Sequence, residues 1–213
     1  MSSARRTVLA LKRWLGGGYR SAQRSIAHVV FERGLQSTES PDVSSGFLYL
    51  ARGLRGSRID SADVLLDYGS GRGRVLLRAA HLPFARVTGV ELDRQDCAMA
   101  RANAEVLAAS GRMRCGEIEV LQVDATAWTV PDDVTYIYMF NPFRGEIFRA
   151  VLARVIESLD RRPRALTLIY ANPTCSGDVI ATGRFERVRA SRWPRPDKPN
   201  QRVEVFKTIG GRR

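Results

Sequence analysis

The sequence predicts one α/β domain built on a largely parallel sheet, preceded by a helical extension. From residue 62 onward, short apolar runs alternate with segments of helical spacing. Most of these runs are too apolar to alternate regularly with polar residues, which is typical of strands covered on both faces. Near the end, Pro194, Pro196 and Pro199 exclude a helix between the last two apolar runs. We therefore expect those two runs to form an antiparallel hairpin at one edge of the sheet.

The expected elements follow this alternation in chain order. A short amphipathic helix at 46–54 closes onto the domain, and Asp93 caps the longest helix, at 94–109. The five parallel strands are expected at 64–68, 86–91, 117–123, 134–140 and 165–171, the other helices at 74–81 and 146–159, and the hairpin strands at 185–190 and 202–209.

Residues 1–45 are expected to form a basic helical extension and a loop, followed by the α/β domain at 46–213. Apolar residues recur at helical spacing on both sides of the three glycines at 16–18, and 37–45 is polar. The same segment is rich in Arg and Ser and nearly free of acids, which is also typical of a cleaved organellar presequence. We favour a helical cap because the apolar pattern continues toward the core.

The composition excludes several protein classes. The chain has 213 residues, 44% of them hydrophobic, and no run of 18 apolar residues, so no membrane span is expected. Its three cysteines have no close spacing, so neither a disulfide framework nor a metal site is predicted. A cytoplasmic location is the corresponding expectation.

The net charge of +12 is concentrated at the two ends of the chain. Residues 1–35 carry seven basic groups and one acid, and 183–213 carry ten and three, so the middle is nearly neutral. Nearly all the basic residues are arginines, which suit phosphate and carboxylate partners. Basic ends leave a nucleic-acid partner open. Codon bias combined with solubility is the simpler explanation of the arginines, and we favour it over a functional basic surface.

The strongest local signal is the glycine-rich turn Asp67-Tyr68-Gly69-Ser70-Gly71-Arg72-Gly73 between a strand and a helix. Such glycines allow a sharp turn and a close approach of backbone to ligand. Glu91 ends the second strand, 22 residues after Gly69, where an acid can accept from ribose hydroxyls. Asp124 ends the third strand, where a carboxylate can accept from an exocyclic amine.

A nicotinamide dinucleotide is the competing ligand for this turn. The glycine spacing is G-x-G-x-G and not G-x-G-x-x-G, and Asp67 precedes it. A carboxylate there would repel a pyrophosphate but would orient an ammonium group. S-adenosylmethionine carries an amino acid and a sulfonium and no phosphate, so it is the expected cofactor.

With these motifs the chain resembles the class I S-adenosylmethionine-dependent methyltransferases over about residues 60–210. The resemblance implies a Rossmann-like seven-stranded sheet of order 3-2-1-4-5-7-6, with strand seven antiparallel. The segment LLDYGSGRGRVLL is also similar to a group of uncharacterised bacterial methyltransferases. These are distantly similar to the histone-lysine methyltransferases that lack a SET domain. The implied cofactor contacts are Asp67, Tyr68, Gly69, Ser70, Gly71, Gly73, Glu91, Leu92, Asp124, Ala125 and Asn141.

Phe140-Asn141-Pro142-Phe143 is similar to the Asn/Asp-Pro-Pro-Tyr/Phe motif of amino-group methyltransferases, with one proline in place of two. Asn141, Pro142 and Phe143 are therefore the expected catalytic residues. The Asn141 amide oxygen and the Pro142 carbonyl would accept N–H groups of an amine, and Phe143 would stack on it. A small molecule or a protein amine is the favoured acceptor. RNA or DNA, or a noncatalytic cofactor-binding or RNA-binding module, is the alternative.

Overall fold

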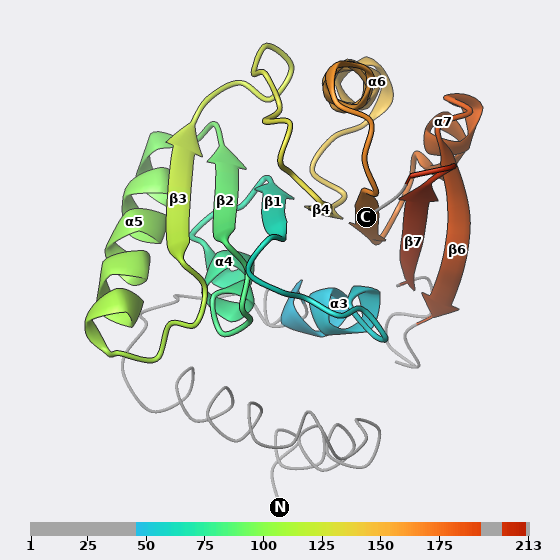
Figure 1. The fold of residues 1–213 in the computed structure, drawn as a ribbon. Helices are drawn as coiled ribbons and strands as arrows, with labels where there is room; N and C mark the ends of the chain where they lie inside the picture. The colour runs from blue at the N-terminus through green and yellow to red at the C-terminus, as the bar shows by residue number, and fades with distance from the viewer. Residues whose placement is uncertain (1–45, 193–201, 212–213) are drawn as a thin grey trace, which may run out of the picture. The chain divides into compact units, whose positions relative to one another are not determined.

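A computed structural model describes residues 46–192 and 202–211, and in them the chain forms one seven-stranded sheet (Figure 1). The strand order is β3-β2-β1-β4-β5-β7-β6, and the pairs among β1 to β5 are parallel. β7 is antiparallel to both β5 and β6. The strands are β1 (Val64–Tyr68), β2 (Arg86–Glu91), β3 (Glu117–Gln122), β4 (Tyr136–Phe140), β5 (Thr167–Ala171), β6 (Phe185–Arg192) and β7 (Arg202–Thr208).

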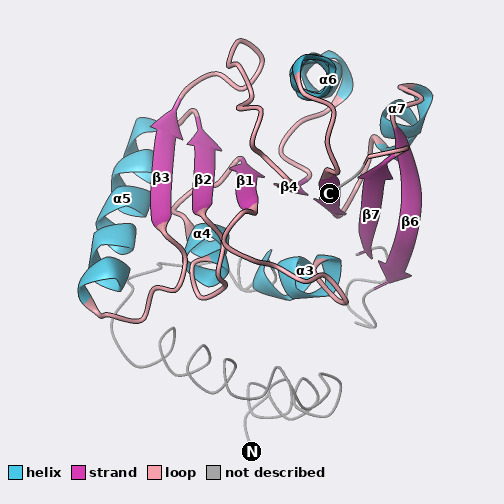
Figure 2. Cartoon of the chain, viewed as in Figure 1, coloured by secondary structure: helices cyan, strands magenta, loops and turns pink. Residues whose placement is uncertain are grey.

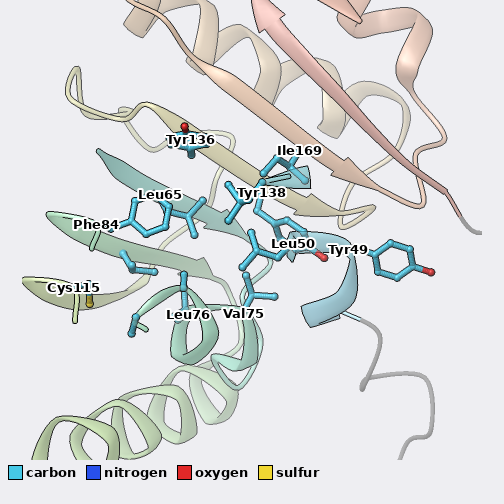
Figure 3. Packing of buried hydrophobic residues seen from close by; sticks show 14 of the residues in the cluster. Tyr49, Leu50, Leu65, Val75, Leu76, Phe84, Cys115, Tyr136, Tyr138 and Ile169 are labelled. Carbon is cyan, nitrogen blue, oxygen red and sulfur yellow. The ribbon is translucent and has the colours of Figure 1, made fainter. Parts of the chain in front are cut away.

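Helices cover both faces of the sheet, as Figure 2 shows by colour. On one face lie α3 (Gly46–Gly53), α4 (Arg74–Ala79) and α5 (Arg94–Ala109), and on the other α6 (Gly145–Arg161) and α7 (Ser176–Ala181). Each face has its own cluster of buried side chains. Figure 3 shows the first cluster, where Leu50 of α3 and Leu76 of α4 pack against sheet residues that include Leu65 and Tyr138.

The predicted fold is confirmed, including the sheet order and the antiparallel hairpin at the edge. Predicted and observed strands differ by at most two residues at any end. Asp93 caps α5 as expected, its carboxylate accepting from the Asp96 amide at 2.8 Å. The expected helix at 74–81 ends two residues earlier, and α7 was not predicted, since six residues are too few to show a helical period. The expected extension at 1–45 lies outside the described residues.

Arg164, which precedes β5, uses every guanidinium N–H in a hydrogen bond. Nε donates to the Val134 carbonyl at 2.6 Å, and the two Nη atoms donate to the carbonyls of Pro131, Ser158 and Arg162 and to Ser158 Oγ. The side chain thus ties the end of α6 to the segment that enters β4. Part of the arginine excess therefore has a structural role. No helix among the described residues has the length and apolarity to cross a membrane.

We expect Arg164→Lys to lower the free energy of unfolding by about 1–3 kcal/mol, because a lysine has three donors and leaves buried carbonyls unpaired. Arg162→Lys is the control, since Arg162 is exposed and exposed changes usually cost under about 0.5 kcal/mol. Urea denaturation measures both. Equal stability of the two variants would show that the Arg164 contacts contribute nothing specific.

Candidate cofactor and acceptor site

The predicted site residues lie where the parallel strands β1 to β4 end. Because these strands run in the same direction in adjacent register, their carboxyl ends meet at one edge of the sheet. In Figure 1 the arrowheads of β1, β2 and β3 point toward this edge. Ligands of open α/β sheets bind at this edge, so the fold brings the candidate residues to the expected place.

The glycine turn after β1 takes backbone angles that favour glycine. Gly69, Gly71 and Gly73 have φ of 69°, 51° and 82°. The amides of Gly69 and Ser70 donate to the Val90 carbonyl at 2.9 and 3.2 Å, which fixes the turn to the end of β2. The Ser70 side chain itself is buried. The turn is therefore held to the sheet by backbone contacts.

Two of these glycines have different surroundings. A β-carbon added to Gly69 would lie 2.7 Å from Cβ of Pro142, so the loop after β4 packs directly on the turn. A β-carbon added to Gly71 would meet nothing nearer than Asp96 Oδ2 at 4.0 Å. Gly71 thus borders open space beside the turn, and the Asn141-Pro142 segment is joined to the turn at Gly69.

Glu91 ends β2 with its carboxylate held by three backbone amides. Oε2 accepts from the Gly71 amide at 2.9 Å, and Oε1 accepts from Leu92 and Asp93 at 2.7 and 3.0 Å. A carboxylate has about four acceptor positions, so about one remains for a ligand hydroxyl. The next side chain, Leu92, is 69% exposed and offers an apolar surface beside it.

Asp67 is a buried acid without a hydrogen-bond or ion-pair partner among the described residues. Its side chain is 2% exposed, and within the described part of the chain no hydrogen bond or ion pair reaches its carboxylate. Burial, and to a lesser extent the charge of Glu91, raises the pKa of Asp67 well above its usual value. Such a group costs the free protein stability and suits a ligand that brings a positive charge.

Asp124 is the exposed acid of the site. Its Oδ1 accepts from both the amide and the hydroxyl of Thr126, at 2.8 and 2.7 Å. These hydrogen bonds lower the pKa of Asp124. The carboxylate is therefore fixed and ionised, and no hydrogen bond from the described residues reaches Oδ2. Ala125, beside it, is buried and contributes packing.

The Asn141 side chain already has two partners. Asn141 has φ of 48°, and its Oδ1 accepts from the Thr174 hydroxyl at 2.7 Å and from Tyr170 OH at 3.2 Å. The oxygen that we expected to accept an amine is thus occupied by two hydroxyls. Tyr170 and Thr174 were missed at the sequence level because Tyr170 lies in an apolar run and Thr174 in a turn, and neither pattern signals a contact with Asn141.

The two aromatic residues predicted for the site face the core. The Tyr68 side chain is fully buried on the α6 side of the sheet, so only its main chain is available to a ligand. Phe143 is half-buried with its ring edge-on to Tyr68, the ring centres 5.9 Å apart. The expected stacking on an acceptor would use the side of Phe143 that remains exposed.

These features fit S-adenosylmethionine as the cofactor. The buried acid Asp67, which has no partner in the part of the chain that the structure describes, matches its ammonium group. Glu91 and Asp124 keep acceptor positions for its ribose and adenine. The open space beside Gly71 admits a ligand close to the backbone. When bound, the cofactor supplies a methyl carbon bonded to a positively charged sulfur. When the methyl group is transferred, this sulfur is the leaving group and becomes a neutral thioether.

We expect Gly71→Ala to weaken cofactor binding at least tenfold, because the added methyl group stands in the space where a ligand approaches the turn. An alanine at this positive φ lowers the free energy of unfolding by roughly 1 kcal/mol. Gly69→Ala is the matched variant. Position 69 also has a positive φ, but there the added methyl group meets Pro142, so the free energy of unfolding should fall by about 1–3 kcal/mol more. Calorimetry and thermal unfolding separate the two, and unchanged affinity in Gly71→Ala would place the cofactor elsewhere.

Comparisons with known proteins agree with this geometry. Residues 65–162 match the family model described as a methyltransferase domain. No curated protein sequence matches the chain. Solved structures resemble its fold at low identity. One is a magnesium protoporphyrin IX methyltransferase from Synechocystis PCC 6803 with bound S-adenosylmethionine (TM-score 0.60, 14% identity, 90% of this chain and 93% of that one).

Two further structures show the same fold. An RNA methyltransferase from Salinibacter ruber, in complex with S-adenosyl-L-homocysteine, has a TM-score of 0.53 and 21% identity over 83% of this chain and 96% of that one. An N-methyltransferase from Bradyrhizobium japonicum has a TM-score of 0.58 and 11% identity over 78% and 96%. The finer likeness to non-SET histone-lysine methyltransferases stays a prediction. The match of residues 65–162 to a methyltransferase domain, on a sheet of this order and direction, supports assignment of the chain to the class I S-adenosylmethionine-dependent methyltransferases.

Proposed function

We propose that the protein methylates a nitrogen atom of a small molecule or of a protein amine. The observation that carries the proposal is the Asn141-Pro142 segment, which follows β4 and packs on the cofactor turn at Gly69. This contact puts the Pro142 carbonyl, which can accept an N–H group of an acceptor nitrogen, and the Asn141 carboxamide beside the turn. The neighbour from Bradyrhizobium japonicum is an N-methyltransferase, which supports the same assignment.

The residues divide into two groups by their place at the sheet edge. Asp67, Gly71, Glu91 and Asp124 hold the cofactor on the β1 to β3 side, with Leu92 as an apolar surface. Pro142 and Asn141 on the β4 side bind and orient the acceptor. Methyl transfer from a sulfonium is an in-line displacement, so the protein contributes chiefly by positioning the two reactants. The nitrogen forms a bond to the methyl carbon as the carbon–sulfur bond breaks, and then loses a proton.

A nucleic acid is the second candidate acceptor. The basic segments at the two ends of the chain favour it, since they attract phosphate groups. The neighbour from Salinibacter ruber is an RNA methyltransferase. If the acceptor is a nucleic acid, we expect its binding affinity to fall steeply between 50 and about 200 mM salt. A flat salt dependence, measured by fluorescence anisotropy, would favour an uncharged metabolite.

Transfer of a tritiated methyl group to cell extract tests the proposal. The extract is fractionated into metabolites, proteins and nucleic acids after the reaction, and the labelled product is hydrolysed to identify the methylated atom. We expect label on nitrogen in the metabolite or protein fraction. Label mainly in nucleic acid would reverse our order of acceptors, and label on oxygen or carbon would refute the nitrogen assignment.

A further inference from the structure

We propose that Tyr170 and Thr174 are positioning residues that turn the Asn141 side chain so that its amide nitrogen, and not its oxygen, faces the ligand. The proposal rests on the proposed function, in which Asn141 lies beside the transferred methyl group. It adds a specificity rule: the ligand group that meets Asn141 carries a lone pair that accepts a hydrogen bond. A carbonyl or a carboxylate satisfies this rule. An ammonium group does not, and neither does the attacking nitrogen itself, whose lone pair must face the methyl carbon.

The first argument is the distance from Asn141 to Thr174. The Thr174 hydroxyl and Asn141 Oδ1 are 2.7 Å apart. This is the usual separation of an O–H···O hydrogen bond, whereas N–H···O bonds centre on about 2.9–3.0 Å. A hydroxyl at that distance therefore favours the carboxamide oxygen over its nitrogen.

The second argument is the state of Tyr170. Burial raises the pKa of Tyr170, so its hydroxyl stays protonated and keeps a hydrogen to donate. Its oxygen accepts from the Thr174 amide at 3.4 Å, and its hydrogen points to Asn141 Oδ1 at 3.2 Å. Tyr170, Thr174 and Asn141 therefore form a closed set of three hydrogen bonds.

The third argument is what these contacts leave free. A carboxamide oxygen has two lone pairs, and both are taken by the two hydroxyls. Within the described residues, no hydrogen bond is made by Asn141 Nδ2, and the side chain is half-buried, so a ligand can reach it. The Pro142 carbonyl likewise accepts no hydrogen bond from the described residues. The site thus presents one donor group and one acceptor group side by side.

The geometry of the chain explains why this arrangement is stable. Asn141 and Asn172 both leave their strands at positive φ, 48° and 49°, and a proline follows each. β4 and β5 are neighbours in parallel register, so the two turns lie together. The second turn carries Thr174 back toward Asn141, while the Tyr170 ring is fixed by stacking on Phe148 at 5.4 Å. The two hydroxyls are therefore held in place before a ligand binds.

Two cofactor analogues test the proposal without a known acceptor. S-adenosylhomocysteine lacks the methyl group, and sinefungin carries an amino group on carbon where the cofactor has its methyl group on sulfur. Calorimetry gives the affinity ratio of sinefungin to S-adenosylhomocysteine. In the wild type we expect a ratio of about one or less, because the protonated amine meets the N–H donors of Asn141.

The variants change this ratio in a defined direction. Asn141→Asp keeps acceptors for both hydroxyls and replaces the donor with a carboxylate, so the ratio should rise at least tenfold. Tyr170→Phe combined with Thr174→Val frees the amide to rotate and should raise the ratio about fivefold. If the double variant is unstable, the ratio is measured in Tyr170→Phe and Thr174→Val separately. Affinity for S-adenosylhomocysteine should stay within about threefold throughout.

Asn172→Asp is the control for added charge, because it places the same carboxylate at the next strand end and should leave the ratio unchanged. A wild-type ratio of ten or more would show that an oxygen already faces the ligand and would overturn the proposal. A rise in Asn141→Asp without any rise in the hydroxyl variants would remove Tyr170 and Thr174 from this role. If the wild-type protein did not bind S-adenosylhomocysteine, that result would instead refute the proposed function.

Discussion

Asp67→Asn should stabilise the free protein and at the same time weaken its binding of S-adenosylmethionine. The buried Asp67 carboxylate lacks a partner in the described structure, so a neutral amide removes the cost of burying a charge. Each kcal/mol gained raises the melting temperature by roughly 2–4 °C in a domain of this size. The same change removes the charge that pairs with the ammonium group, which should cost about 2–5 kcal/mol of binding.

The stabilisation should depend on pH with a defined sign. Since burial raises the folded-state pKa of Asp67 above its unfolded value of about 4, the folded protein binds more protons than the unfolded chain. The stability that comes from this proton is fully present below pH of about 4 and is lost as pH rises through the folded-state pKa. The advantage of Asp67→Asn over wild type should therefore grow from acidic toward neutral pH, as measured by thermal unfolding.

Asp63→Asn is the matched control for this prediction. Asp63 is also buried, but its carboxylate accepts from the Asp60 amide at 3.1 Å and from the Thr135 hydroxyl at 3.0 Å. We expect that substitution to destabilise the protein and to leave cofactor affinity unchanged. If Asp67→Asn were also destabilising, or bound the cofactor as tightly as wild type, Asp67 would not be the buried cofactor-pairing acid described above.

The sequence predicted the sheet because its strand segments are too apolar to alternate regularly with polar residues. β1 and β2 have the predicted bounds, and Asp67 and Glu91 lie within the last two positions of their strands, where each strand reaches the ligand edge. The acids of the site were visible for the same reason. A charged residue at the end of a buried strand has no role in packing, so its presence indicates a ligand.

The contacts between loops were not predictable in this way. The packing of Pro142 on Gly69 depends on β1 and β4 being neighbours, and no local pattern encodes that contact. The occupation of the Asn141 oxygen by Tyr170 and Thr174 depends in addition on the register of β4 with β5. Side-chain partners that are distant in sequence require the assembled sheet, whereas the residue types at strand ends do not.

Asn141→Ala should reduce the rate of methyl transfer about a hundredfold and change cofactor affinity by less than about threefold. The side chain is held by two hydroxyls at the end of β4, beside the glycine turn. In the proposed function it orients the acceptor, and the Asp67 and Glu91 side chains hold the cofactor without it. A displacement of the acceptor of about 1 Å costs on the order of a hundredfold in rate. Because the loss falls on the transition state, kcat should fall more than KM changes.

The backbone at Asn141 requires a control. An alanine at φ of 48° is strained by roughly 1 kcal/mol, independently of any contact that the Asn141 side chain makes. Asn172→Ala introduces the same strain at φ of 49° on the neighbouring strand end and should keep wild-type turnover. Asn141→Gly removes the side chain without strain and should be as slow as Asn141→Ala. Turnover is measured on the acceptor identified by the methyl-transfer screen, and affinity by calorimetry. Wild-type turnover in Asn141→Gly would leave the 140–143 segment with only a structural role, and an oxygen or carbon acceptor would then be the better assignment.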